Sequence, residues 1–388
     1  MPPLPFSDLD VLLAKFVEEG KIAGGMGAVL SKDGIKHLSV TGQQDRERGL
    51  PMREDALFRI YSMTKPITSL AAMMLWEEGH FHLDEPVATF LPSFTDTRIF
   101  EETGAHSRSG TQMTIRHVLS HSAGITLPAF SDDLLADLYR THDLDGMRSR
   151  GPLSEVIDRL GTMPVLFEPG TRWKYSMATD ILGRLIEIWS GLTFEKFLQA
   201  RIFDPLGMSE TSFAADPSQN TRMTTNYAVQ KNGIVGVVDA GEGSSFFKKP
   251  AFNSGSGGLV STLSDFTAFM QMLINRGMSD GKQLIKPETL ALMHENHLTG
   301  DMAEMGAGDF NNMSWAGIGF GLGFYTILNS ERAAFPEPAG EYGWTGAAGT
   351  LFFINPELEI GGLLLVQHMP GNIYTLRKQF REAVYAGL

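Results

Sequence analysis

The stretch FRIYSMTKPIT (residues 58–68) places a serine and a lysine three residues apart at the start of a helical pattern. Apolar residues then recur at helical spacing as far as Gly79. Residues three apart share one face of a helix, so the Lys65 amine can reach the Ser62 hydroxyl. The positive potential at a helix N-terminus also favours negative charge on a serine oxygen. The pattern therefore predicts an activated serine nucleophile, although an ordinary N-capping serine would give the same letters.

Strand patterns lie at both ends of the sequence. Two β-rich runs surround an Asp-Gly pair within residues 27–40, which predicts a hairpin. Further strand patterns follow residue 319, at 320–328, 341–344, 350–354 and 360–366. Helical patterns precede the first group and follow the last, at about residues 7–20 and 372–385.

The middle of the chain, from about residue 110 to 245, carries mostly helical patterns separated by Pro and Gly turns. The simplest packing unites the terminal strands. We therefore predict an α+β fold, in which a mostly antiparallel sheet from both chain ends is flanked by helices and accompanied by a mainly helical inserted domain. The expected α/β domain comprises residues 1–70 and 250–388, the helical domain comprises 71–249, and the active site lies in the cleft between them.

Composition excludes several classes of protein. The chain has 388 residues, 43% hydrophobic and 20% charged, which is typical of a globular protein. With 32 Lys and Arg against 45 Asp and Glu, the net charge is −13, so nucleic acid is not an expected partner. No Cys occurs, which excludes a thiolate nucleophile, disulfides and Cys-ligated zinc. Without a signal-peptide pattern or a run of about 18 apolar residues, we expect a cytoplasmic protein with no membrane partner.

The stretch around Ser62 resembles the nucleophile segment of the serine β-lactamase and penicillin-binding-protein superfamily. Segments similar to the other signatures of that superfamily follow in its order: TIRHVLSHSAG (114–124), FEPGTRWKYS (167–176), SGGLVST (256–262) and GWTG (343–346). The resemblance spans nearly the whole chain, and its nearest branch is the class C-like family VIII carboxylesterases. It implies a serine β-lactamase-like fold and a carboxylesterase that needs no cofactor or metal.

The resemblance also implies a role for each matching residue. Ser62 would attack an acyl carbon, and Lys65 and the Tyr175 phenol would share the proton transfers. The backbone N–H groups of Ser62 and Ala347 would form the oxyanion hole. A tyrosine, with a pKa near 10, is a poor base at pH 7, but a neighbouring ammonium favours its phenolate. Whether Lys65 or Tyr175 accepts the first proton stays open.

Two departures from the β-lactamase pattern bear on the substrate. Met177 stands where class C enzymes have the Asn of Tyr-x-Asn, so a side-chain amide is missing. Trp344, followed by Thr345 and Gly346, stands where they have the Lys of Lys-Thr-Gly, so a carboxylate-binding cation is missing. We expect Met177, Trp344 and Gly346 to contact a neutral small-molecule ester with a short acyl chain. Weak β-lactam hydrolysis is a secondary expectation.

Other functions stay open at this stage. A β-lactamase, a D-amino-acid peptidase or an acyltransferase could use the same scaffold, and a non-catalytic sensor or assembly module is the alternative of another class. No Gly-x-Ser-x-Gly occurs, which argues against an α/β-hydrolase. His117 and His121 have the spacing of a zinc pair but lack the Glu of His-Glu-x-x-His, so we expect no metal there.

Overall fold

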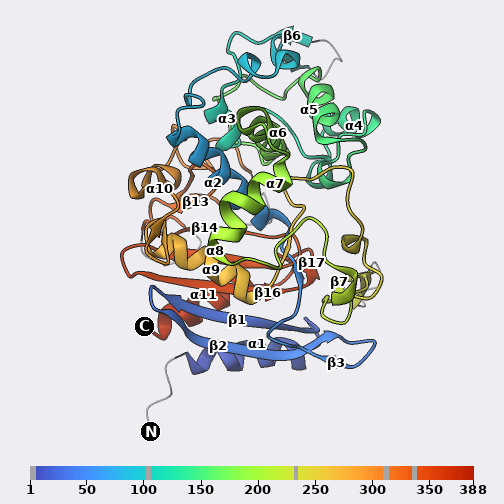
Figure 1. Cartoon of the computed structure of the whole chain (residues 1–388), viewed down its shortest axis with the longest axis vertical. Coiled ribbons are helices and arrows are strands. Elements are labelled where there is room, and N and C mark those ends of the chain that lie inside the picture. Colours follow the sequence, from blue (N-terminus) through green and yellow to red (C-terminus); the bar gives the residue numbers. More distant parts are fainter. Residues whose placement is uncertain (1–5, 102–105, 231–234, 309–313, 334–338) are drawn as a thin grey trace.

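The computed structural model describes residues 6–101, 106–230, 235–308, 314–333 and 339–388. Its largest element is an antiparallel sheet with the strand order β12-β13-β14-β15-β16-β1-β2-β3 (Figure 1). The strands are β12 (Ile318–Phe320), β13 (Tyr325–Ile327), β14 (Tyr342–Thr345), β15 (Leu351–Asn355), β16 (Ile360–Val366), β1 (Gly24–Ser31), β2 (Gly34–Asp45) and β3 (Leu50–Pro51). The predicted fold class, a large antiparallel sheet flanked by helices, is confirmed.

The two ends of the chain meet in the middle of this sheet. β1 pairs with β16 over seven residues, from Gly25 opposite Val366 to Ser31 opposite Ile360. Every residue of both strands is buried, as expected for central strands that are covered on both faces. The hairpin predicted around the Asp-Gly pair is β1 and β2, which pair through Ser31 and Gly34.

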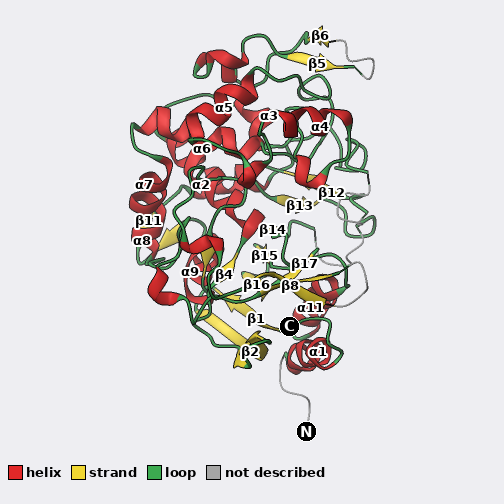
Figure 2. Cartoon of the chain, turned by 90° about the vertical axis from the view of Figure 1, so that its right-hand side faces the viewer, coloured by secondary structure: helices red, strands yellow, loops and turns green. Residues whose placement is uncertain are grey.

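Alternate residues of the central strands supply two separate cores. On one face, Val29 and Phe353 pack in a cluster with α1 (Ser7–Glu18) and α11 (Leu376–Ala386). On the other face, Ala28 and Phe352 belong to the main core, which includes Phe266 of α9 (Leu263–Ile274). Figure 2 shows α1 and α11 together on one side of the sheet, with most of the other helices on the opposite side.

The helices of the main core follow the predicted patterns closely. α2 is buried along almost its whole length, including polar residues such as Thr64, Lys65 and Thr68. The helices are α2 (Thr64–Glu77), α3 (Ile115–Leu119), α4 (Leu134–Thr141), α5 (Leu153–Gly161), α6 (Ala178–Ser190), α7 (Phe194–Leu198), α8 (Asp204–Leu206), α9 (Leu263–Ile274) and α10 (Pro287–His294). No helix in the described part of the chain is long and apolar enough to cross a bilayer. The predicted domain boundaries stay a prediction.

One expectation about a strand was wrong. Residues 320–328 do not form one strand, because the chain turns at Gly321 and Gly323 between β12 and β13. Gly323 has a φ of +103°, and a Cβ at Gly321 would lie 2.1 Å from the Met293 carbonyl oxygen, so neither position accommodates a side chain. The expected helical middle also contains strands, since β7 (Asn226–Val229) and β8 (Val235–Asp239) form a small sheet with β17 (His368–Met369).

Candidate active site

Ser62 lies where a strand turns into a helix. β4 (Phe58–Arg59) pairs with β9 (Val260–Ser261), a single 3₁₀ turn (Tyr61–Met63) follows, and α2 then begins. Tyr61 has a φ of +44°, a strained value for a residue with a side chain, so the chain bends sharply just before the serine. Pro66 is tolerated because it falls in the first turn of α2, where its missing N–H is not needed.

The structure brings the three predicted side chains together. The Tyr175 hydroxyl donates a hydrogen bond of 2.5 Å to Ser62 Oγ, and Lys65 Nζ donates to the same oxygen at 3.4 Å. Lys65 Nζ also lies 4.5 Å from the centre of the Tyr175 ring. All three side chains are buried, with Ser62 9% exposed and Lys65 2% exposed. A proton on any of the three groups can therefore reach the others without bulk water.

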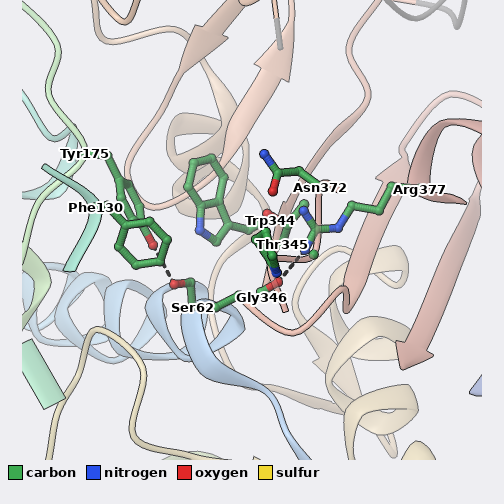
Figure 3. A pocket seen from close by; sticks show the side chains of 11 residues that line it. Ser62, Phe130, Tyr175, Trp344, Thr345, Gly346, Asn372 and Arg377 are labelled. Carbon is green, nitrogen blue, oxygen red and sulfur yellow. Dashed lines mark hydrogen bonds between the residues drawn. The ribbon is translucent and has the colours of Figure 1, made fainter. Parts of the chain in front are cut away.

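These side chains meet beside a small pocket. Figure 3 shows aromatic side chains on one side of it and Asn372 and Arg377 on the other. The pocket is lined by Ser62, Phe130, Tyr175, Trp344, Thr345, Gly346, Ala347, Pro370, Gly371, Asn372 and Arg377. The pocket thus combines an aromatic wall with a polar wall.

Trp344 faces the pocket from β14 with an unused hydrogen-bond donor. The residue is 2% exposed, and its indole Nε1 has no hydrogen-bond partner among the described residues. In Figure 3 the indole nitrogen lies on the side of the ring toward Tyr175 and Ser62. A buried N–H without an acceptor is costly unless a ligand supplies one.

The loop after β14 lies at the pocket beside the nucleophile. Gly346 lies so close to the Ile60 carbonyl that a Cβ there would be 2.5 Å from its oxygen, so only glycine allows this approach. Within the described part of the chain, no backbone carbonyl accepts the next N–H, that of Ala347. Gly346 and Ala347 both line the pocket beside Ser62. The predicted oxyanion donors are thus placed at the pocket wall.

Met177 is not brought to the pocket. It is fully buried immediately before α6 and does not line the pocket. Lys65 instead donates a hydrogen bond of 2.7 Å to the backbone carbonyl of Ser256. The departure from Tyr-x-Asn is therefore accompanied by a backbone acceptor for the lysine.

Several residues that line the pocket were not predicted from the sequence, among them Phe130, Asn372 and Arg377. Arg377 donates hydrogen bonds to the carbonyls of Gly346 and Gly349, so α11 holds the loop after β14. Burial lowers the pKa of Arg377 to about 10, which still leaves a cation at neutral pH. The only signal in the sequence is the amphipathic pattern of the last helix, in which an arginine looks like an ordinary surface residue.

Asp180 is a further buried group that the sequence analysis missed. It is fully buried in the first turn of α6, five residues after Tyr175. Its Oδ1 accepts hydrogen bonds from Ser254 Oγ (2.8 Å) and from the Ser256 N–H (2.9 Å). It therefore binds the segment that supplies the carbonyl acceptor of Lys65.

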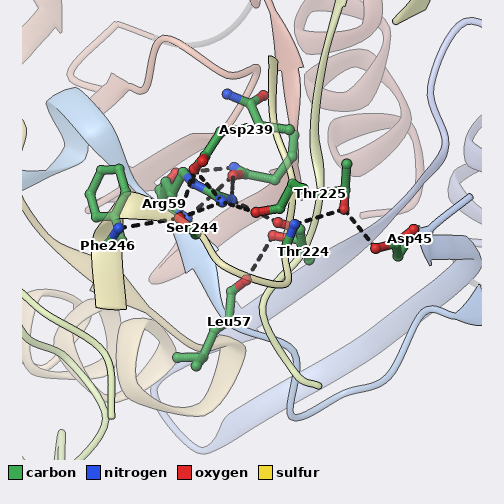
Figure 4. A network of polar contacts seen from close by, with 12 residues as sticks. Asp45, Leu57, Arg59, Thr224, Thr225, Asp239, Ser244 and Phe246 are labelled. Carbon is green, nitrogen blue, oxygen red and sulfur yellow. Dashed lines mark hydrogen bonds and ion pairs between the residues drawn. The ribbon is translucent and has the colours of Figure 1, made fainter. Parts of the chain in front are cut away.

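A second polar network surrounds Arg59, in the strand that precedes the nucleophile (Figure 4). Arg59, fully buried, donates to Asp239 at 2.6 Å, to the Thr224 carbonyl at 2.7 Å and to Ser244 Oγ at 2.9 Å. Its guanidinium also donates to the Gln367 side chain at 3.3 Å. The network joins β4 to the loop after β8 and to the end of β16.

His117 and His121, which have the spacing of a zinc pair, make separate structural contacts. His117 takes part in a capping box with Thr114 at the start of α3. His121 is buried, and its Nδ1 lies 2.9 Å from Ser176 Oγ. Burial and, to a smaller extent, the charge of Lys65 lower the pKa of His121 well below its usual value. Among the residues that the structure describes, no group of three or more acidic or His side chains is arranged to hold a metal ion.

Comparisons with known proteins identify the family of the chain. The model of the family described as Beta-lactamase matches residues 9–385. Esterase EstB of Burkholderia gladioli is 30% identical, with 97% of this chain and 94% of that protein covered. Acyltransferase calJ of Penicillium decumbens is 28% identical, with coverage of 94% and 93%. The solved structure of EstCE1, a hydrolase with promiscuous acyltransferase activity, is 26% identical, with a TM-score of 0.82 and 97% of each chain covered.

Proposed function

The chain belongs to the beta-lactamase family, and we propose that it is a carboxylesterase that acts through an acyl-enzyme at Ser62. Its esterase and acyltransferase relatives support an enzyme of the hydrolase or transferase type. One observation carries the proposal: the Tyr175 hydroxyl and Lys65 Nζ lie 2.5 and 3.4 Å from Ser62 Oγ at the wall of a pocket. That is the arrangement required to remove and return a proton at a serine nucleophile.

In the first half-reaction, Ser62 Oγ attacks the ester carbonyl carbon and its proton passes to the Lys65 and Tyr175 pair. The carbonyl oxygen becomes an oxyanion held by the backbone N–H groups of Ser62 and Ala347. The C–O bond to the alcohol then breaks, and Tyr175 returns the proton to the departing alkoxide. The products are the free alcohol and an ester of the acyl group with Ser62.

In the second half-reaction, water attacks the acyl-enzyme. The Lys65 and Tyr175 pair accepts a proton from the water, and the oxyanion forms again in the same place. The bond to Ser62 Oγ breaks, the proton returns to that oxygen, and the carboxylic acid leaves. The close contact of Tyr175 with Ser62 suits both directions of transfer.

The pocket walls support a small ester as substrate. Phe130 and Trp344 offer aromatic surface to an acyl or alcohol group, and the small size of the pocket favours a compact one. Trp344 in place of a lysine removes a cation that would attract a β-lactam carboxylate. We therefore expect ester turnover to exceed turnover of nitrocefin or D-Ala peptides.

Acyl transfer is a second candidate, favoured by the acyltransferase relatives. An alcohol that enters in place of water would take the acyl group from Ser62 by the same proton transfers. The two outcomes share one covalent intermediate and differ only in the attacking oxygen.

The proposal is tested by covalent labelling and a substrate panel. A fluorophosphonate should add its mass to the peptide containing Ser62, and p-nitrophenyl esters from acetate to octanoate should be hydrolysed faster than nitrocefin. Addition of a primary alcohol to the assay distinguishes transfer from hydrolysis by the ester that forms. An unlabelled Ser62, together with no ester turnover, would contradict the proposed function.

A further inference from the structure

A buried carboxylate lies beside the proposed site but outside its pocket. Asp180 has no exposed surface and does not line the pocket. Its Oδ1 accepts two hydrogen bonds, from Ser254 Oγ and from the Ser256 N–H, whereas its Oδ2 has no partner among the described residues. Burying a half-satisfied carboxylate is costly, so its presence requires a compensating role.

The segment that Asp180 binds also holds the lysine of the site. Ser256 presents its N–H to Asp180 at 2.9 Å and its carbonyl oxygen to Lys65 Nζ at 2.7 Å. Thr68, on the same face of α2 as Lys65, donates at 2.9 Å to the carbonyl of the residue before Ser256. Segment 254–256 is therefore fastened to α6 by a carboxylate and to α2 by a hydroxyl.

We propose that Asp180 is a positioning residue for the reaction proposed above: it fixes the Ser256 carbonyl, which in turn holds the Lys65 amine against Ser62 Oγ. The inference rests on the proposed function. With Met177 away from the pocket, this backbone carbonyl is the acceptor that orients the lysine. Asp180 holds the segment that carries this carbonyl, and it does so without contact with the substrate.

The charge of Asp180 adds a second effect to its hydrogen bonds. Burial raises the pKa of Asp180, whereas its hydrogen bonds to Ser254 and Ser256 and the charge of Lys65 lower it. The electrostatic interaction is mutual, so a change of charge at residue 180 also acts on Lys65.

Other titratable groups also face this pair. Tyr175 faces Lys65 from the segment before α6, and His121 interacts with Lys65 from the segment after α3. Arg377 of α11 interacts with Tyr175 across the pocket. A change in the pH profile is therefore assigned to Asp180 only if it follows the charge of residue 180 while these neighbours are unchanged.

The test compares Asp180→Asn with Asp180→Ala, and uses Asp265→Asn as a matched control. Asp265 is also the third residue of a buried helix, accepts from a hydroxyl and a backbone N–H at 2.8 Å each, and has a pKa raised by burial. It lies outside the pocket and has no contact with Lys65. Loss of stability alone should therefore affect both sites similarly.

We expect Asp180→Ala to lower kcat on p-nitrophenyl acetate by at least about 30-fold, with KM within about threefold, because the lysine and not the pocket is displaced. Asp180→Asn keeps an acceptor for Ser254 and Ser256, so it should recover most of kcat. Loss of the charge should still displace the acidic limb of its kcat/KM profile from that of the wild type. Asp265→Asn should keep both kcat and the wild-type profile.

The outcomes separate this inference from the proposed function. If the wild-type protein is labelled at Ser62 and active, an Asp180→Asn profile that matches the wild type overturns the inference alone. A folded Asp180→Ala protein with wild-type kcat does the same. If the alanine variant does not fold, Asp180→Asn and Ser254→Ala provide the test. Ser254→Ala removes one of the two hydrogen bonds to Asp180 while the carboxylate remains. It should therefore lower kcat without moving the acidic limb of the kcat/KM profile. An inactive, unlabelled wild type would mean that the proposed function itself is wrong.

Discussion

Two buried polar clusters lie three residues apart on the chain, around Arg59 and around Ser62. The guanidinium of Arg59 finds its acceptors within the protein (Figure 4), and no Arg59 nitrogen is left unpaired among the described residues. The Ser62 cluster leaves Trp344 Nε1, Ser256 Oγ and Asp180 Oδ2 without partners in the same part of the chain. The comparison separates a network completed by folding from one that has capacity left for a ligand or a reaction.

Removing the nucleophile should have the largest effect on the second cluster. We expect Ser62→Ala to lower kcat/KM for p-nitrophenyl acetate by at least about 10⁴-fold, because no acyl-enzyme can form. The melting temperature should stay close to that of the wild type, since only one hydroxyl is lost. Steady-state kinetics and calorimetry on the same preparation measure both. Turnover within tenfold of the wild type would mean that Ser62 is not the nucleophile.

Removing Arg59 should mainly lower the stability of the fold. Arg59→Met removes the cation that pairs with Asp239 and the donor to the Thr224 carbonyl, and we expect the free energy of unfolding to fall by about 3 kcal/mol. Urea denaturation followed by fluorescence measures it. The matched control is Arg53→Met, which breaks the exposed pair of Arg53 with Asp55 and should leave stability near the wild-type value. Equal losses in the two variants would contradict the distinction.

His368 tests whether an unpaired buried group always indicates function. It is buried on β17, and both of its ring nitrogens lack partners among the described residues. Burial lowers the pKa of His368 to about 4, from 6.5. The unfolded chain therefore binds the proton more tightly, and stability present above pH 6.5 is lost as the pH falls from about 6.5 toward 4.

His368→Phe should accordingly reduce the acid sensitivity of the fold. The slope of unfolding free energy against pH should become shallower in this window by up to about 1.4 kcal/mol per pH unit. Urea denaturation at several pH values measures the slope, while kcat/KM at pH 7.5 should be unchanged. A slope identical to the wild type would show that another group is responsible.

Trp344→Phe should give the smallest effect and the sharpest contrast. It removes the unpaired N–H at the pocket, so we expect kcat/KM for esters to fall about tenfold, or about 1.4 kcal/mol of transition-state stabilisation. Trp189→Phe is the control, because Trp189 Nε1 is likewise buried without a partner in the described chain but lies against Phe81, away from the pocket. Equal kinetic losses in both variants would remove the assigned role of the indole N–H.

The parts of the molecule that follow from local sequence were predictable. Ser62 and Lys65 share one helical turn, and strands such as β15 and β16 follow from runs of apolar residues. The prediction of a single strand at residues 320–328 was wrong, because the apolar pattern continues through a turn that packs against Met293. Periodicity does not record which distant backbone will lie beside a glycine.

The rest of the site depends on contacts between distant segments. Asp180 meets a segment more than 70 residues later in the sequence, and nothing in its helical context distinguishes it from a surface carboxylate. Arg377 reaches the pocket only because α11 packs beside the loop after β14. Tyr175 could be found because a family resemblance marked it. Site residues outside the family motifs can be identified only from the tertiary structure.

The pairing of β1 with β16 affects how the protein is made. The ribosome synthesises β1 more than 300 residues before β16. Strands β1, β2 and β3 are therefore synthesised before the strand that pairs with β1 in the middle of the sheet exists. Trp344 and Ala347 are translated late as well. A nascent polypeptide therefore carries Ser62 and Lys65 for most of its synthesis without the opposite wall, and on the proposed mechanism a prematurely terminated message yields an inert product.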